Sequence, residues 1–385
     1  MYILKLLLRN AFRHKLRTAL TILSITIAIV SFGLLRSFVS AWYAGAEASS
    51  ASRLITRNSI SLIFTLPLSY KDKIRQIDGV KRISYGNWFA GIYIDEKNFF
   101  ANYAVEAKNY MELYPEFIVP PDQKEAFLRD RKGCVAGEKL IERYHWRIGD
   151  IITLKGTVFP GNWEFVLRGI YHGRDESTDE RVFFFHWDYL NETLKKRAPR
   201  RADQVGWYAI EVTDPSRVAE VAQAIDGTFK NSLAETLTET EKAFFLSFIS
   251  MADAIIVAIQ LVSFVVIIII VAVTANTMAM TARERIGEYA IFKTLGFRGW
   301  RIGGMIIGES LLITLIGCLV GIALTSPTAR VFSRYVATYF PTFRVEIETI
   351  YMDIGASILV GLCAAIIPTW RAVKIRIADG LRRIG

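Results

Sequence analysis

Four stretches of this 385-residue sequence carry almost no charge and are long enough to cross a lipid bilayer. The hydrocarbon layer is roughly 30 Å thick, so a spanning helix needs about 17–25 apolar residues. A soluble protein of this size rarely concentrates its hydrophobic residues, here 52% of the chain, in this way. The sequence therefore predicts four transmembrane helices, at Thr18–Leu35, Ala254–Ala275, Ile302–Ser326 and Ile354–Trp370.

The net charge of +10 belongs to the regions around these helices. Between Tyr43 and Ser250 there are 28 Lys and Arg against 29 Asp and Glu, whereas the remaining residues hold 19 basic and 8 acidic side chains. Lys and Arg beside membrane helices mark the cytoplasmic side. With four helices, the N-terminus, the loop after the second helix and the C-terminus share one side, and these are the three basic regions. We therefore expect cytoplasmic termini, an extracytoplasmic segment between the first two helices, and lipid headgroups rather than nucleic acid beside the basic residues.

The first apolar stretch also has features of a cleaved signal peptide. It follows a basic start, and Ala44-Gly45-Ala46 resembles a small-residue cleavage site. Its apolar run exceeds the roughly 7–15 residues of a signal-peptide core, which favours a retained membrane helix. The preceding residues Met1–Arg17 are predicted to form an amphipathic helix at the cytoplasmic surface, or a simple basic flank.

The segment between the first two membrane helices has the pattern of a mixed α+β domain. It runs from about Ala46 to Ser250, long enough for two subdomains, with a break expected at the polar run Asp175–Asp179. Asp95–Asn98 is expected to turn a hairpin, and Thr236–Ser250 to begin the long second membrane helix. The predicted fold is thus an α-helical membrane protein with four transmembrane helices and a mixed α+β extracytoplasmic domain of two subdomains.

Sequence patterns for catalysis or metal binding are not found. Gly287–Thr294 ends in Lys-Thr but lacks the glycine before the lysine that a phosphate-binding P-loop requires. His172 and His186 flank an acidic run, where a solvated loop is a better interpretation than a metal site. We expect no catalytic residue, no metal ligand and no cofactor bound by this chain. The four histidines, which show no metal-ligand spacing, are His14, His145, His172 and His186.

The most informative segment follows the second predicted membrane helix and runs from Asn276 to Gly296. Its charges alternate in sign around an apolar stripe, and Gly296 suits a helix C-terminus. A short amphipathic helix of this kind presents an apolar face to a partner's groove, or else lies on the membrane surface. The stripe consists of Ile286, Ala290, Ile291 and Leu295.

This segment resembles the signature of the FtsX-like permeases, a group that includes MacB, LolC and LolE. The resemblance rests on an Asn at the end of the second helix, Arg-x-x-Glu around a short helix, and then Lys-x-Leu-Gly. The insert resembles a MacB-type periplasmic domain, through Gly133–Leu140, Gly149-Asp150 and Val166–Ile170. Further matches are Glu309, Gly317, Gly321, Pro368, Arg371-Ala372 and Leu381-Arg382.

The resemblance divides the chain into three regions. Residues 1–45 hold the N-terminal helix and first membrane helix, 46–250 the MacB-like periplasmic domain, and 251–385 the FtsX-like region with a coupling helix at 283–295. The sequence departs from MacB by lacking a fused ATPase. It also has Ile377-Ala378-Asp379-Gly380 where the family often has an Asp-Pro pair, which leaves the course of the tail open.

The resemblance implies a permease subunit in the bacterial inner membrane that works with a separate ABC ATPase carrying ATP and Mg²⁺. A second permease subunit, identical or not, is implied as well; a periplasmic adaptor and an outer-membrane channel are optional partners. We hypothesise that Ile286, Ala290 and Ile291 enter an ATPase groove while four charged residues fix the register. The implied coupling residues are Arg283, Glu284, Arg285, Ile286, Glu288, Ala290, Ile291, Lys293 and Gly296.

Four residues within the predicted membrane helices are assigned a structural or coupling role: Asn276, Glu309, Gly317 and Gly321. A carboxylate inside a membrane helix is costly, and Glu309 is expected to pair with Arg301 or with a polar group on another helix rather than to relay protons. The Gly317-x-x-x-Gly321 spacing allows close helix contact and is a weak indication of where a dimer packs.

Two functions follow from the resemblance. The first is export or extraction of an envelope amphiphile, peptide or lipoprotein, driven by the ATPase through movement of the periplasmic domain. The second is FtsX-like signalling, in which the outer domain activates a cell-wall hydrolase. A third interpretation, a membrane-anchored ectoenzyme or sensor without ATP, does not account for the segment from Asn276 to Gly296.

Overall fold

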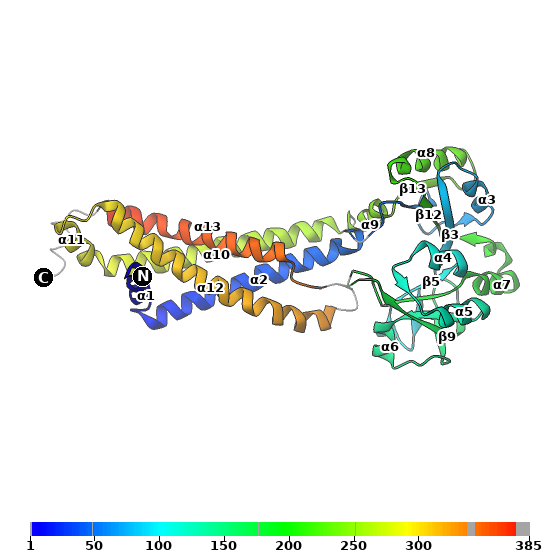
Figure 1. Ribbon diagram of the computed structural model, residues 1–385, viewed down its shortest axis with the longest axis horizontal. Coiled ribbons are helices and arrows are strands. Elements are labelled where there is room, and N and C mark those ends of the chain that lie inside the picture. Colours follow the sequence, from blue (N-terminus) through cyan, green and yellow to red (C-terminus); the bar gives the residue numbers. More distant parts are fainter. Residues whose placement is uncertain (1, 48, 176, 251, 337–342, 375–385) are drawn as a thin grey trace. The chain divides into compact units, whose positions relative to one another are not determined.

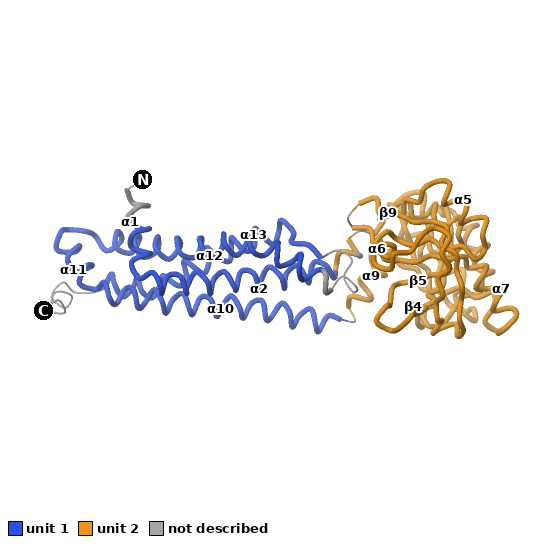
Figure 2. Tube along the Cα trace, turned by 90° about the horizontal axis from the view of Figure 1, so that it is seen from below, with its two compact units in different colours: residues 1–42, 252–336, 343–385 blue, residues 43–251, 337–342 orange. Residues whose placement is uncertain are grey.

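The computed structural model describes residues 2–47, 49–175, 177–250, 252–336 and 343–374, and the chain forms two compact units (Figures 1 and 2). The first, which we call the bundle, comprises residues 1–42, 252–336 and 343–385. The second, which we call the inserted domain, comprises residues 43–251 and 337–342. The departure from the family pattern at 377–380 lies outside the described residues.

The bundle confirms the four predicted apolar helices. Each is long and apolar enough to cross a membrane: Lys15–Ala44, Asp253–Glu284, Gly299–Ser333 and Ile347–Lys374. The predicted N-terminal helix is shorter than expected, because it ends at Ala11 and a turn separates it from the first span. The helices of the bundle are α1 (Tyr2–Ala11), α2 (Lys15–Glu47, continuing beyond the bundle), α10 (Asp253–Glu284), α11 (Ile286–Thr294), α12 (Gly299–Val336) and α13 (Ile347–Lys374).

Small residues let α2 and α12 approach closely. A Cβ added to Gly317 would lie 2.7 Å from Ile25, and one added to Gly321 would lie 2.7 Å from Ile29. Either distance is too short for a carbon–carbon contact, so both positions require glycine. The glycine pair is therefore used inside the chain, and the indication that it marks a dimer contact is wrong.

Polar side chains join α12 and α13 through backbone carbonyls. The Ser310 hydroxyl donates to the Gly361 carbonyl at 2.8 Å, and the Ser357 hydroxyl donates to the Thr314 carbonyl at 2.9 Å. Both serines are buried. In a bilayer, apolar burial does not distinguish helix contact from lipid contact, so such hydrogen bonds and close packing hold helices together.

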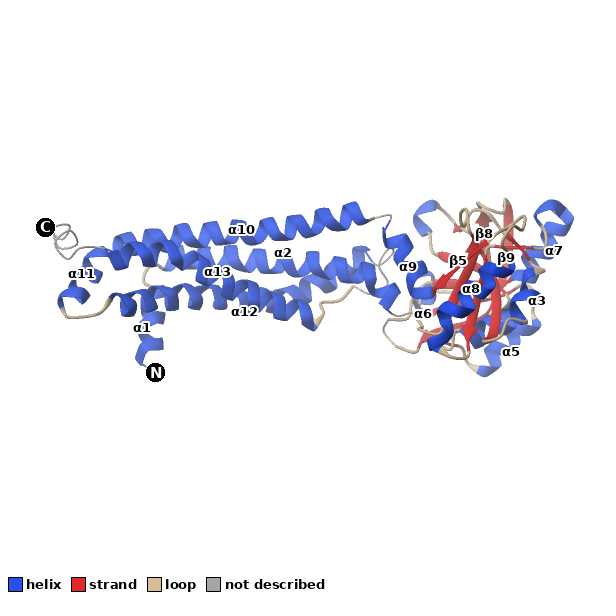
Figure 3. Cartoon of the chain, turned by 90° about the horizontal axis from the view of Figure 1, so that it is seen from above, coloured by secondary structure: helices blue, strands red, loops and turns tan. Residues whose placement is uncertain are grey.

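The inserted domain is built on one mixed sheet (Figure 3). Its strand order is β13-β1-β12-β3-β5-β10-β7-β9-β8-β4, with β6 also paired to β9. The pairs β5–β10 and β7–β9 are parallel, and the others are antiparallel. The strands are β1 (Arg53–Asn58), β3 (Val80–Trp88), β4 (Gly91–Tyr93), β5 (Ala101–Val105), β6 (Phe117–Ile118), β7 (Gly133–Gly137), β8 (Ile151–Gly156), β9 (Gly161–Gly173), β10 (Val182–His186), β12 (Trp207–Val212) and β13 (Thr236–Thr240), with β2 (Leu66–Pro67) and β11 (Gln204–Val205) forming a separate pair.

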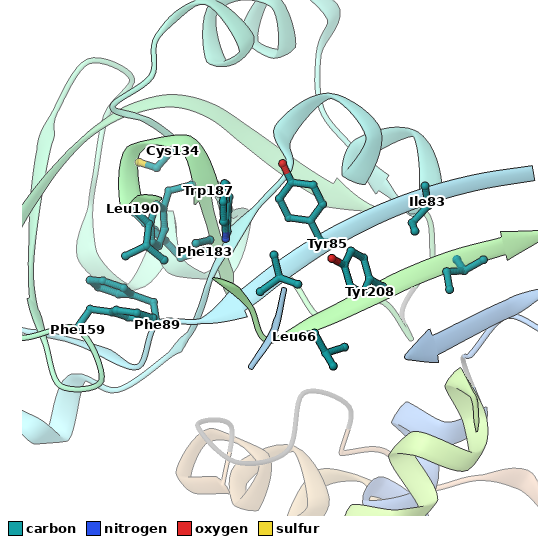
Figure 4. Close-up of a cluster of buried hydrophobic side chains, with 14 of the residues drawn as sticks. Leu66, Ile83, Tyr85, Phe89, Cys134, Phe159, Phe183, Trp187, Leu190 and Tyr208 are labelled. Carbon is teal, nitrogen blue, oxygen red and sulfur yellow. The ribbon is translucent and has the colours of Figure 1, made fainter. Parts of the chain in front are cut away.

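Both faces of this sheet are covered. Along β10, Phe183 and Phe185 join one apolar core, whereas Val182 and Phe184 join the other. This explains why four successive residues of the strand, Val182–Phe185, are hydrophobic, since a strand buried on both faces does not alternate with polar residues. Figure 4 shows part of the first core, where the rings of Phe89 and Phe159 stack. The helices of the domain are α3 (Tyr70–Arg75), α4 (Ala107–Leu113), α5 (Pro121–Arg129), α6 (Glu138–Tyr144), α7 (Trp187–Arg197), α8 (Val218–Thr228) and α9 (Glu241–Ser250).

Three local predictions for the domain are wrong. The expected break at 175–179 does not divide it, because β9 and β10 on either side belong to one sheet and the domain is one compact unit. Asp95–Asn98 forms a short 3₁₀ turn rather than a hairpin, since β4 pairs with β8 and β5 pairs with β3 and β10. Thr236–Ser250 is strand β13 followed by the separate helix α9, not the start of α10.

Candidate coupling site

The predicted coupling helix at 283–295 consists of two elements. Helix α10 ends at Glu284, Arg285 leaves the helical conformation with ψ of 12°, and α11 runs from Ile286 to Thr294. Gly296 follows with φ of +86°, a left-handed conformation that favours glycine after a helix end. Arg283 and Glu284 therefore belong to the end of α10, and only the residues after Arg285 form the short helix.

Arg285 is the centre of a buried ion cluster. The residue is 6% exposed, and its guanidinium donates to Glu309 at 2.9 Å and to Glu288 at 2.9 Å. Burial by itself lowers the pKa of Arg285, but Tyr289, Glu288 and Glu309 outweigh that effect and hold the pKa above its ordinary value. Burial and the neighbouring carboxylates raise the pKa of Tyr289 to about 12. Glu309 thus pairs with Arg285. The prediction that it pairs with Arg301 is wrong.

The cluster extends to the turn between α1 and α2 and to the first turn of α2. Arg13 forms an ion pair with Glu288, and Arg17 donates to both oxygens of Glu284 at 2.7 and 2.9 Å. Burial would raise the pKa of Glu288, but its hydrogen bonds with Arg13 and Arg285 lower it. The first turn of α11 is therefore fixed to α12 through Arg285 and to the α1–α2 turn through Glu288.

The apolar stripe of α11 divides between the inside and the outside of the bundle. Ala290 is 0% exposed, and its neighbour Tyr289 packs among residues of α10, α12 and α13. Ile286 is half-buried, whereas Ile291 is exposed and Leu295 is 69% exposed. The hypothesis that Ala290 enters a partner's groove therefore does not fit this arrangement.

The exposed apolar residues in and just after the last turns of α11 form what we call the α11 face: Ile291, Leu295 and Phe297. Lys293 does not belong to it, because its ammonium group donates to the Val373 carbonyl of α13 at 2.7 Å. The hypothesis that Arg285 and Glu288 fix the register of a partner is also altered, since both are engaged within the chain. Arg283 remains exposed in the last turn of α10.

Two polar residues of the spans differ in burial. Asn276 is exposed on α10. Asp353 of α13 is 1% exposed, and its Oδ1 atom has no hydrogen-bond partner among the described residues. Sequence reasoning missed Asp353 because the fourth apolar stretch was drawn from Ile354, one residue later. A boundary set by the helix rather than by hydropathy would have included it.

One cluster in the inserted domain has metal-ligating side chains. Glu138, His172 and Glu180 have ligand atoms within 4.8 Å of one another. His172 already pairs with Glu138 at 2.8 Å, and Lys139 lies 3.5 Å from Glu180. These contacts already engage carboxylate oxygens of both glutamates, and the interpretation of this region as a solvated loop remains the simpler one.

Two family models cover most of the sequence. Residues 18–228 match the MacB-like periplasmic core domain, and residues 260–377 match the C-terminal region of the FtsX-like permeases. The chain belongs to the MacB/FtsX-like family of ABC transporter permeases. In this family the chain is the permease and not itself the ATPase. The predicted resemblance is thereby confirmed.

Individual relatives are distant from this permease. It is 23% identical over 266 residues to the lipoprotein-releasing system transmembrane protein LolC of Haemophilus influenzae, covering 64% of this chain and 63% of that one. It thus spans less than two thirds of that relative. It is 22% identical over 324 residues to the uncharacterized ABC transporter permease MJ1507 of Methanocaldococcus jannaschii, covering 80% of this chain and 77% of that one.

Two solved structures are similar to about half of this chain. The extracellular domain of the noncanonic ABC-type transporter YknZ from Gram-positive bacteria has a TM-score of 0.36 at 9% identity, covering 49% of this chain and 100% of that one. The periplasmic region of MacB from Actinobacillus actinomycetemcomitans has a TM-score of 0.38 at 9% identity, covering 52% and 94%.

Proposed function

We propose that this permease couples ATP hydrolysis on a separate ATPase, which binds ATP and Mg²⁺, to movement of the inserted domain. The work done is export or extraction of an envelope amphiphile, peptide or lipoprotein. The observation that carries the proposal is the α11 face, an exposed apolar surface on a helix whose other side is anchored in the bundle. Such a surface suits a groove on a partner protein, and its anchoring lets a push on α11 reach α12 and α2.

The proposed orientation places α11 in the cytoplasm and the inserted domain in the periplasm of a cell whose inner membrane holds the bundle. Support comes from the basic residues beside α11 and at both chain ends, because Lys and Arg concentrate on the cytoplasmic side. The near-neutral inserted domain then lies on the opposite side of the membrane from α11. A periplasmic adaptor and an outer-membrane channel are optional in this scheme and are not required by any feature of the bundle.

We assign the second subunit to the outer face of α10. Among the many exposed residues of α10, one set is spaced at alternating intervals of four and three, which is the spacing of a helix-pairing seam. Asn276 lies on this seam, and an amide on an apolar seam sets the register of two helices by pairing across it. The seam consists of Ala258, Val262, Val265, Ile269, Ala272 and Asn276.

Replacing Ile291 and Leu295 together by Glu tests the docking of the ATPase. The permease is purified with its partners in mild detergent, and we expect an ATPase to accompany the wild-type chain and to be lost from the double variant. Ile63→Glu is the matched control, since Ile63 is also exposed but belongs to the inserted domain. Absence of an ATPase from the wild-type preparation contradicts the proposal, and co-purification of a cell-wall hydrolase moves the function to signalling.

A cysteine at Ala272 tests the α10 seam. In a Cys363→Ser background, where Cys134 and Cys318 remain buried, we expect Ala272→Cys to form a disulfide between two copies. Leu319→Cys, exposed on α12, is the control and should stay uncrosslinked. Equal crosslinking at the two positions contradicts the assignment of the seam.

A further inference from the structure

Arg53, Glu116 and Glu241 form a buried ion cluster within the inserted domain, which we call the Arg53 clamp. Arg53 is 6% exposed and Glu241 is 4% exposed. The Arg53 Nε group donates to Glu241 at 2.8 Å, and its two Nη groups donate to Glu116 at 3.1 and 2.5 Å. The guanidinium also donates to the Leu113 carbonyl at 3.2 Å and lies 4.3 Å from the centre of the Tyr114 ring. The planar group is thus held in one orientation from several sides.

The clamp joins the two ends of the inserted domain. Arg53 is the first residue of β1 and follows shortly after α2 in the chain, whereas Glu241 is the first residue of α9 and precedes α10. The backbone N–H of Ser50 donates to the same Glu241 carboxylate at 3.1 Å. The incoming arm, Ser50–Arg53, and the outgoing arm, α9, therefore share one carboxylate.

Glu116 connects Arg53 of the incoming arm to the core of the domain. It lies between α4 and β6, next to Tyr114, which packs with Leu113 in the apolar core that contains Phe184 of β10. β6 in turn pairs with β9. Arg53 therefore links α9, through Glu241, and the α4–β6 segment, through Glu116, to the start of β1.

Separating the arms would leave buried charges without partners. Burial by itself lowers the pKa of Arg53, but the hydrogen bond with Glu116 and the charges of Glu241 and Glu116 hold it above its ordinary value, so Arg53 stays charged. A buried charge that loses its partner raises the free energy of the folded protein by far more than the loss of an apolar contact does. Charge-assisted hydrogen bonds are also directional, whereas apolar contact allows sliding.

We propose that Arg53 is a positioning residue that locks the incoming and outgoing arms into one rigid body. A displacement of the chain at either arm then reaches the sheet as a single movement instead of spreading the arms apart. The use of this lock in transport rests on the proposed function, which supplies the displacement. The lock itself needs no ATP, so it can be tested separately.

The test measures the distance between spin labels on the two arms of the full chain in lipid nanodiscs. Labels are attached to Ala51→Cys and Lys242→Cys, both exposed positions, in a Cys363→Ser background. We expect a narrow distance distribution with the native clamp and a broad one with Glu241→Gln. Amide hydrogen exchange in α9 should become roughly tenfold faster, the factor expected for losing about one net hydrogen bond.

Arg57→Gln is the matched control. Arg57 also lies on β1 and pairs with Glu239 of β13 at 3.0 Å, but it is not part of the arms. The distribution of label distances should stay narrow in this variant. If the loss of any ion pair on β1 loosened the domain, the distribution would broaden here as well.

A narrow distribution in Glu241→Gln, with β10 still protected from exchange, overturns the proposal. Arg53→Gln is a further variant that removes the guanidinium itself. If it does not fold, Glu241→Gln and Glu116→Gln still test the proposal, because they leave the guanidinium in place. Adding the partner ATPase with ATP separates the two proposals. Wild-type arms that stay locked but do not move relative to a membrane-helix label contradict the proposed function and leave the lock standing.

Discussion

The bundle and the inserted domain are each stabilised internally by a different kind of interaction. The core of the inserted domain is built from aromatic rings, with Phe185 in contact with Phe89 and Phe165. The bundle instead relies on glycines such as Gly321 and on serine hydroxyls such as that of Ser357. In water, burying a large apolar side chain is the main source of stability, whereas a helix in lipid gains little from it. Substitutions that remove volume should therefore harm the domain most, and those that add volume should harm the bundle.

The largest expected effect is that of Phe185→Ala in the inserted domain. Phe185 is fully buried, so its loss removes apolar burial and leaves a cavity, at a cost of about 3–5 kcal/mol. The free energy of unfolding is measured by denaturant titration followed by tryptophan fluorescence. Phe64→Ala, an exposed phenylalanine in the same domain, should change stability little. Equal effects of the two variants would remove the basis of the comparison.

Gly321→Leu should be the most harmful simple change in the bundle. The added side chain meets Ile29 of α2 at a backbone approach that only glycine permits, and overpacking of this kind costs about 1–3 kcal/mol. Unfolding in mixed micelles, followed by circular dichroism, provides the measurement. Gly304→Leu adds the same volume where a Cβ meets no atom within 4 Å, and it should be tolerated. Indistinguishable results at the two glycines would contradict the close approach of α2 and α12.

A weaker effect depends on pH and is confined to the inserted domain. His186 is buried, which lowers its pKa below the ordinary 6.5, and its Nε2 atom lies 2.7 Å from the Phe127 carbonyl, to which the neutral ring donates. The unfolded chain therefore binds a proton more readily than the folded one, so stability is lost as the pH falls below about 6.5. Hydrogen exchange of β10 in the full chain at several pH values should show this loss. His186→Gln should weaken the dependence, and an unchanged dependence would assign it to other groups.

The smallest effect is expected for Ser357→Ala in the bundle. The change removes one hydrogen bond between α13 and the Thr314 carbonyl of α12, worth about 0.6 kcal/mol for hydrogen bonds of this type in membranes. The same micelle titration measures it, with Ser333→Ala as a control because that hydroxyl bonds only within its own helix. A loss as large as that of Phe185→Ala would show that polar contacts dominate the bundle.

The sequence predicted the parts of the fold that depend on local pattern. Four apolar runs suffice for four membrane helices, because a spanning helix needs only an apolar stretch of sufficient length. The pairing of strands is not local, which is why β4 was wrongly placed in a hairpin with β5 instead of beside β8.

The candidate site was predicted as a segment but not as a geometry. The order Arg-x-x-Glu identifies α11 as special, yet it does not show that Tyr289 and Ala290 are buried, because burial depends on how the other helices pack. The partner of Glu309 is likewise a residue of another element. Arg53 and Glu241 are 188 residues apart, and no pattern in the sequence links them.

The pairing of β1 with β13 places the two ends of the inserted domain side by side, with Leu54 opposite Thr240. A domain whose ends are neighbours can be exchanged for another without moving the chain that carries it. Evolution can therefore place unrelated inserted domains on the same helical bundle. Recombination needs to conserve only the two short segments that connect them. Because of this property, the inserted domain could be grafted onto a soluble helical hairpin and produced without the bundle.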